Sequence, residues 1–172
     1  MKKPSQFPDS FSIFILGWTE NPVDFDTVFN ASRNTWSWGS PDILPMFAKG
    51  SNKIENLDDR GPYSRPNPKV VIDTYDAKFE DFSSSVDPSA TDSWVFDKVE
   101  EFFDYALEGE NQELRLKLRD DKIILFLHLL GLDTNGHTRK PNSPEHEENI
   151  RLVDEGVKRY LLIELYKNLK TT

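Results

Sequence analysis

The sequence has no cysteine, no long run of basic residues and no apolar run long enough to cross a bilayer. Without cysteine, neither a disulfide nor a zinc site built from thiolates can form. The net charge of −9 makes nucleic acid an unfavourable partner, because the phosphate backbone repels an acidic protein. The apolar stretch at 11–16 is too short for a membrane span and lacks a small-residue cleavage site, so we expect no signal peptide there.

The chain nevertheless has enough residues and enough large apolar side chains to build one domain with a core. Its 172 residues include 12 Phe and 4 Trp, and 37% of them are hydrophobic. A chain of this length buries most of the apolar surface that its unfolded form exposes. We therefore expect one globular unit rather than an extended or disordered chain.

Strand patterns and helix patterns alternate along the sequence. Apolar residues at three- and four-residue spacings predict a helix from Asp92, with Asp92 or Ser93 as its cap. They also predict a final helix at about 147–169 that has Ile150, Val153, Val157 and Leu161 on one face. Strands are predicted at 35–39, 70–75 and 123–127, and further helices at 21–32 and 111–119. Such alternation predicts an α/β layered domain with a mostly parallel central sheet. Residues 49–69, rich in Gly, Pro and charge, are expected to form an exposed loop insertion.

The stretch from Lys122 to His137 carries the clearest chemical pattern. Its apolar run, 123–127, predicts a strand buried on both faces, and a polar loop with Asp133 and His137 is expected to follow. Ligands of α/β proteins bind where strands end, and carboxylate oxygen and imidazole nitrogen are both zinc ligands. The alternative is a capping aspartate beside a surface histidine, and the pattern alone does not exclude it.

Two shorter motifs have both a functional and a structural interpretation. Ser40 and Asp42, in the sequence Gly-Ser-Pro-Asp after the first predicted strand, could line a pocket or simply form a turn. Asn30 begins the sequence Asn-Ala-Ser, which is an acceptor motif for N-glycosylation and also arises by chance.

Long strings within residues 17–50, 91–103 and 126–158 go beyond composition, among them WSWGSPDILPMF and HLLGLDTNGH. In this order they resemble the lumenal catalytic domain of the GPI ethanolamine phosphate transferases, which belong to the alkaline phosphatase superfamily. The resemblance implies that residues 17–172 are part of an alkaline phosphatase-like domain, whereas 1–16 do not match it.

The resemblance also implies an activity and a cellular location. These enzymes transfer phosphoethanolamine from phosphatidylethanolamine to a mannose, here the first mannose, of the GPI anchor precursor. Two zinc ions hold the phosphate, and a threonine alkoxide attacks it to form a phospho-enzyme. The complete proteins lie in the endoplasmic reticulum membrane with this domain on the lumenal face.

Carried over to this chain, the resemblance makes Asp133 and His137 zinc ligands. Ser40 and Asp42 then lie near the substrate pocket, and His128 lies behind the site as a packed histidine or as a hydrogen-bonding neighbour of a ligand. A lumenal location would make Asn30 a glycosylation site.

Other parts of the family pattern have no counterpart in these 172 residues. The nucleophilic threonine and the first aspartate ligand are expected upstream, and a later Asp-His pair and the membrane helices downstream. We therefore expect this chain to be part of a transferase. On its own it would carry one incomplete zinc site and show no catalysis. The alternatives are a non-catalytic lumenal binding domain and an unrelated acidic interaction module.

Overall fold

The computed structural model describes residues 27–48, 53–55, 69–80, 86–108 and 111–169. Residues 1–16 and the first half of the predicted helix at 21–32 lie outside this part of the chain. The described strands form one four-stranded sheet in the order β2-β3-β1-β4, and every neighbouring pair is parallel. The strands are β1 (Asn34–Gly39), β2 (Lys53–Glu55), β3 (Val70–Thr74) and β4 (Ile123–Leu127). The α/β class and the parallel sheet predicted from the sequence are thus confirmed.

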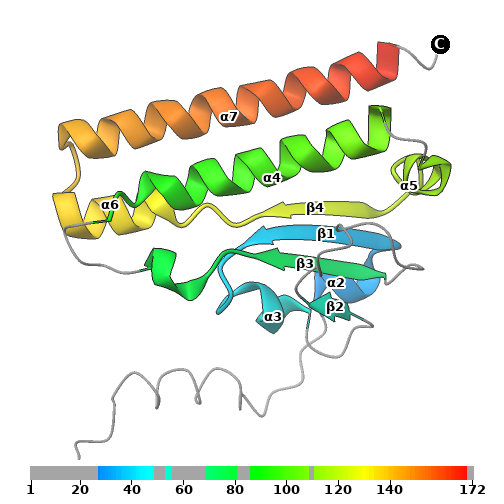
Figure 1. Cartoon of the computed structure of the whole chain (residues 1–172), viewed down its shortest axis with the longest axis horizontal. Coiled ribbons are helices and arrows are strands. Elements are labelled where there is room, and N and C mark those ends of the chain that lie inside the picture. Colours follow the sequence, from blue (N-terminus) through cyan, green and yellow to red (C-terminus); the bar gives the residue numbers. More distant parts are fainter. Residues whose placement is uncertain (1–26, 49–52, 56–68, 81–85, 109–110, 170–172) are drawn as a thin grey trace, which may run out of the picture.

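Helices lie on both faces of this sheet (Figure 1). The short helices α2 and α3 cover one face, α4 crosses the other, and α7 packs on the outside of α4. The described helices are α2 (Val28–Ala31), α3 (Leu44–Phe47), the 3-10 turn η1 (Ala77–Glu80), α4 (Ser89–Glu108), α5 (Gln112–Lys117), α6 (Gly131–Arg139) and α7 (Pro144–Leu169).

The sheet separates two apolar clusters, because alternate residues of a strand point to opposite faces. On the α4 side, Trp36 and Trp38 of β1 pack against Phe102, whose ring centroid lies 5.4 and 5.2 Å from theirs. On the other side, Phe29 of α2 packs edge-on against Phe126 of β4 at 5.6 Å. Because all neighbouring strands are parallel, their carboxyl ends lie at one edge of the sheet, between these two clusters.

The strand β4 packs on both faces, as predicted, but is only partly buried. It lies at the edge of the sheet, and all five of its residues remain partly exposed. The strand buried along its whole length is β1, which has neighbours on both sides. The apolar sequence predicted two packed faces correctly, but it carried no information on the position of the strand within the sheet.

Three local predictions were wrong. The polar stretch after β4 forms helix α6 rather than a loop. Helix α4 begins at Ser89, whose N–H donates to the Asp87 carboxylate at 3.0 Å, so neither Asp92 nor Ser93 caps α4. The range expected to be a loop insertion, 49–69, contains β2, which pairs with β3.

Among the described side chains of α7, the apolar face is not the buried face. Ile150 and Val157 are 47% and 43% exposed, whereas Asn149 and Gly156 are buried. A side chain at Gly156 would overlap the Phe96 ring, because its Cβ would lie 2.4 Å from two ring carbons. The missing side chain lets α7 approach α4 closely, and this contact, rather than the apolar stripe, sets the orientation of the helix.

Candidate functional site

The carboxyl ends of β1 and β4 meet at one edge of the sheet, where ligands of α/β proteins bind. The His128 N–H donates to the Trp38 carbonyl at 2.9 Å and extends the pairing beyond the strands. Gly39 follows with φ +145°, and a Cβ there would lie 2.6 Å from the Cβ of His128. Only glycine fits both this backbone conformation and this contact. The close contact between Gly39 and His128 therefore fixes where the two segments that carry the predicted site residues begin.

Asp133 and His137 lie on one face of α6, one helical turn apart. His137 Nε2 is 3.5 Å from Asp133 Oδ1, and the two side chains are 75% and 66% exposed. The structure thus brings these two predicted zinc ligands together, although through a helix rather than through a folded loop. One carboxylate and one imidazole supply two of the three or four protein groups that a zinc site needs. Among the described residues, no group of three or more His, Asp or Glu is close enough together to hold a metal ion.

Ser40 and Asp42 form the turn that leads from β1 into α3. The Ser40 hydroxyl is buried and accepts the Asp42 N–H at 3.1 Å, while the Ser40 carbonyl accepts the Leu44 N–H at 3.2 Å. Asp42 is exposed. These contacts show that Ser40 stabilises the turn. The predicted location of Ser40 and Asp42 beside a substrate stays a prediction.

His128 is packed between the ends of the strands. Its ring stacks on Phe126 with centroids 6.5 Å apart, and burial lowers the pKa of its imidazole. Its Nδ1 is buried and has no hydrogen-bond partner among the described residues. The packing of the ring is as described, and the predicted role of His128 behind the zinc site stays a prediction.

Tyr75, directly after β3, was not identified from the sequence. Burial, followed by the nearby Glu80 carboxylate, raises the pKa of its phenol. Its hydroxyl lies near the Ser40 hydroxyl and the Glu80 carboxylate. The apolar stretch that ends in Tyr75 predicts a strand, and nothing in it indicates that the hydroxyl is buried at the end of β3.

A buried polar network holds the beginning of α6, and it was also not identified from the sequence. The Asp92 carboxylate, with no exposed surface, accepts the Gly131 N–H at 2.8 Å and the Asn149 amide at 2.7 Å. Burial raises the pKa of Asp92. Asp92 therefore caps the first turn of α6 from a different helix, which explains why a sequence with Thr, Asn and Gly is helical there. One signal was available: Asp92 falls in the apolar stripe of its own helix, three residues before Val95 and seven before Val99.

Asn30 lies in α2 and is partly exposed. Its backbone carbonyl accepts a hydrogen bond from the Lys69 ammonium. The Ser32 hydroxyl of the same motif is buried and bonds to the Phe29 carbonyl at 2.8 Å. The motif is thus ordered within the fold, and its modification stays a prediction.

The sequence is similar to segments of much longer proteins. It is 48% identical over 157 residues to GPI ethanolamine phosphate transferase 1 of Mus musculus, which is 91% of this chain and 15% of that protein. The identity is also 48% over 152 residues to the Homo sapiens protein of the same name, and over 166 residues to that of Aspergillus oryzae. These alignments cover 88% and 95% of this chain and 14% of each relative.

No family model matches the sequence, and no solved structure matches it. None of the described helices combines the length and the apolar composition needed to span a membrane. The chain thus spans about one seventh of the length of the curated relatives it matches, in mammals and in fungi alike. It is a homologue of one segment of GPI ethanolamine phosphate transferase 1.

Proposed function

We propose that this chain is part of a GPI ethanolamine phosphate transferase. The longer protein would move a phosphoethanolamine group from phosphatidylethanolamine to a hydroxyl of the first mannose of the GPI anchor precursor, with diacylglycerol as the leaving alcohol. The observation that carries the proposal is the 48% identity, across nine tenths of the chain, to proteins of this name. The nucleophile and the other ligands then belong to parts of the protein outside these residues, so the chain alone would be inactive.

In this proposal Asp133 and His137 supply an oxygen and a nitrogen ligand to zinc. Their exposure of 66% and 75% leaves both groups accessible, and their position one helical turn apart lets them reach a common point. Bound zinc would act as a Lewis acid on the phosphate group. The role of α6 is to hold the two ligands at a fixed separation, and Asp92 fixes the beginning of that helix through Gly131.

A chimaeric enzyme tests the proposal. The matching segment of the Aspergillus oryzae relative is replaced by this chain, and transfer is followed from phosphatidylethanolamine labelled in its ethanolamine to a mannosylated GPI precursor. We expect the chimaera to be active, and Asp133→Ala or His137→Ala to lower transfer by at least about 100-fold and to reduce the bound zinc. Glu155→Ala is the matched control, because Glu155 is an exposed carboxylate on α7. Full activity of Asp133→Ala would contradict the assignment of the ligands.

The same proposal places the longer protein in the endoplasmic reticulum membrane, with this segment on the lumenal side. Asn30 would then carry a glycan. The measurement is the electrophoretic mobility of the chimaera before and after treatment with an N-glycosidase, compared with Asn30→Gln in the same background. We expect Asn30→Gln to migrate faster than its parent only before the glycan is removed, and equal mobility before treatment would refute the modification.

A further inference from the structure

Two buried amides extend the Asp92 network from α4 through α7 to α6. Asn149 donates its amide to Asp92, so its Oδ1 faces the other way, and there it accepts the amide of Asn135. A carboxylate only accepts hydrogen bonds, and this fixes the orientation of both amides in turn. The network ends at Asn135 Oδ1, which points away from Asn149 as an acceptor.

This last acceptor is buried and unsatisfied. Asn135 is 1% exposed, and its Oδ1 has no hydrogen-bond partner in the described part of the chain. Buried polar atoms are nearly always paired, because an unpaired acceptor loses its hydration without compensation. The position of Asn135 therefore points to a donor supplied from outside the described residues.

Asn135 lines a cleft of about 720 Å³ between the beginning of α4, helix α6 and the first turns of α7. Its wall includes Asp87 and Ser89 near the start of α4, Arg139 of α6, and Glu145 and Glu148 of α7. The cleft is large enough for a small molecule.

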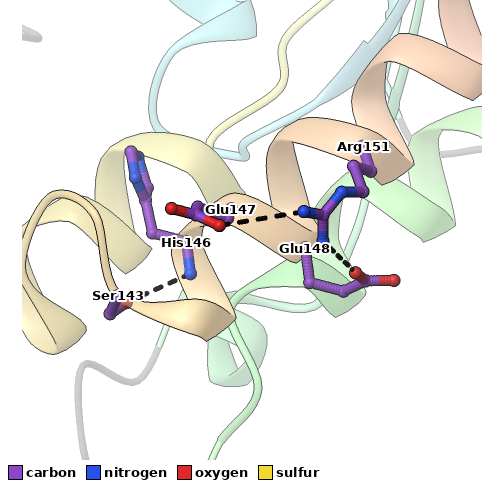
Figure 2. A network of polar contacts seen from close by, with 5 residues as sticks. All are labelled: Ser143, His146, Glu147, Glu148 and Arg151. Carbon is purple, nitrogen blue, oxygen red and sulfur yellow. Dashed lines mark hydrogen bonds and ion pairs between the residues drawn. The ribbon is translucent and has the colours of Figure 1, made fainter.

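Carboxylates outnumber guanidinium groups around this cleft. Its acidic residues are Asp87, Glu145, Glu147 and Glu148, and its basic residues are Arg139 and Arg151. Figure 2 shows Arg151 reaching toward Glu147 and Glu148, at 3.7 and 2.9 Å, so its charge is already balanced within the wall. With four carboxylates against two guanidinium groups, these six side chains carry a net charge of −2, which favours a cation over an anion.

We propose that this cleft binds a small molecule through an ammonium group that donates to Asn135 Oδ1 and lies among the carboxylates of the wall. An ammonium group is both a hydrogen-bond donor and a cation, so it meets both requirements. The inference does not depend on the transferase proposal. Successive helical residues are about 100° apart, so Asn135 lies on the face of α6 opposite Asp133 and His137.

The test is a titration of the ¹⁵N-labelled chain with ethylammonium chloride, followed by NMR. We expect saturable shifts of the Asn135 side-chain amide and of the backbone amides of Glu145 and Glu148. Ethanol has the same size without the charge, and sodium chloride at matched concentration controls for ionic strength. The inference is wrong if ethanol or sodium chloride shifts the same signals equally, or if ethylammonium causes no saturable shift.

Two variants locate the site. Asn135→Leu keeps the size of the side chain and removes the acceptor, so we expect affinity to fall at least about tenfold. This variant also loses the bond to Asn149, and the second variant covers the case in which it does not fold.

The second variant combines Glu145→Gln with Glu148→Gln, both exposed. Each lost charge should weaken ethylammonium binding about twofold, as expected for charges several ångströms apart in a mostly aqueous setting. Glu155→Gln, an exposed carboxylate on the same helix outside the cleft, should leave affinity unchanged. Equal affinity in the double variant and in Glu155→Gln would overturn the inference.

Discussion

The neighbouring strands β1 and β4 reverse the usual relation between hydrophobicity and burial. The six residues of β1, which include Asn34, Thr35 and Ser37, are all buried, whereas the five apolar residues of β4 are all partly exposed. The polar side chains of β1 are satisfied internally: Ser37 donates to the Val71 carbonyl at 2.9 Å, and Thr35 shares a hydrogen bond with Ser32. Position in the sheet order, rather than composition, decided which strand is buried.

This difference shows where the stability of the domain is concentrated. Buried polar groups with satisfied partners cost little, and the two tryptophans of β1 bury large apolar areas on the α4 side. Within the described sheet β4 is an edge strand, and such a strand presents one row of its backbone groups and its partly exposed side chains to another strand. We therefore expect substitutions in β1 to be more damaging than matched substitutions in β4.

The largest effect is expected where the two strands meet. Gly39→Val places a branched side chain at φ +145° and against the carbonyl of His128, which would lie 2.8 Å from the new Cβ. Strain and overlap together should lower the free energy of unfolding by at least about 5 kcal/mol. Urea denaturation followed by tryptophan fluorescence measures the change.

Gly136→Ala is the control for this substitution. Gly136 is inside α6, and a Cβ there would meet only His146 Nε2, at 3.8 Å. Alanine favours the helix over glycine, so stability should rise by up to about 1 kcal/mol. A comparable loss in both variants would mean that Gly39 is not under special constraint.

Trp38 and Leu127 are partners in the β1–β4 register and give a matched comparison of centre and edge. Trp38→Ala, at a side chain that is 1% exposed, should cost about 4 kcal/mol, and Leu127→Ala about 2 kcal/mol. The measurement is again the denaturation midpoint at constant slope. Equal losses would show that the edge strand contributes as much as the centre.

Asp73, opposite Trp38 in β3, should make the stability of this region depend on pH. Burial raises its pKa to about 6, so the folded protein binds a proton more tightly than the unfolded chain. Its contribution is therefore favourable below about pH 4 and is lost as pH rises through about 6, by roughly 3 kcal/mol in all. Stability measured from pH 4 to pH 7 should show this decline, and Asp73→Asn should remove it. If the stability of Asp73→Asn depends on pH as that of the parent does, another group is responsible for the decline.

The smallest effect is expected at the amino ends of the same two strands. Arg33, before β1, forms an ion pair with Asp121, before β4, at 2.8 Å, but both side chains are more than half exposed. Water screens such a pair, so Arg33→Ala should cost less than about 0.5 kcal/mol. A loss above 1 kcal/mol, measured in the same denaturation assay, would mean that this pair helps to hold the edge strand.

Local patterns predicted the framework of the fold and much less of its arrangement. The strand β3 and helix α5 were found almost to the residue, because alternation and helical spacing depend on neighbours in the chain. The edge position of β4 and the rotation of α7 depend on contacts between distant residues, such as Gly156 against Phe96. No local pattern records those contacts.

The same limit applies to the candidate site. Asp133 and His137 were identified as a pair, because their spacing is visible in the sequence and holds in a helix as well as in a loop. The network that positions them was missed, because its members, Asp92, Asn135 and Asn149, are far apart in the chain. A carboxylate within an apolar helical stripe was the one sign of it.

The tertiary cap on α6 has a consequence for exchange with solvent. The Gly131 N–H donates to a carboxylate that is held by α4 and has no exposed surface, so fraying of α6 alone does not release this proton. Its deuterium exchange requires α4 and α6 to separate. The amide of Gly131 should therefore exchange far more slowly than is usual in the first turn of a helix, and its exchange rate reports how firmly Asp133 and His137 are held.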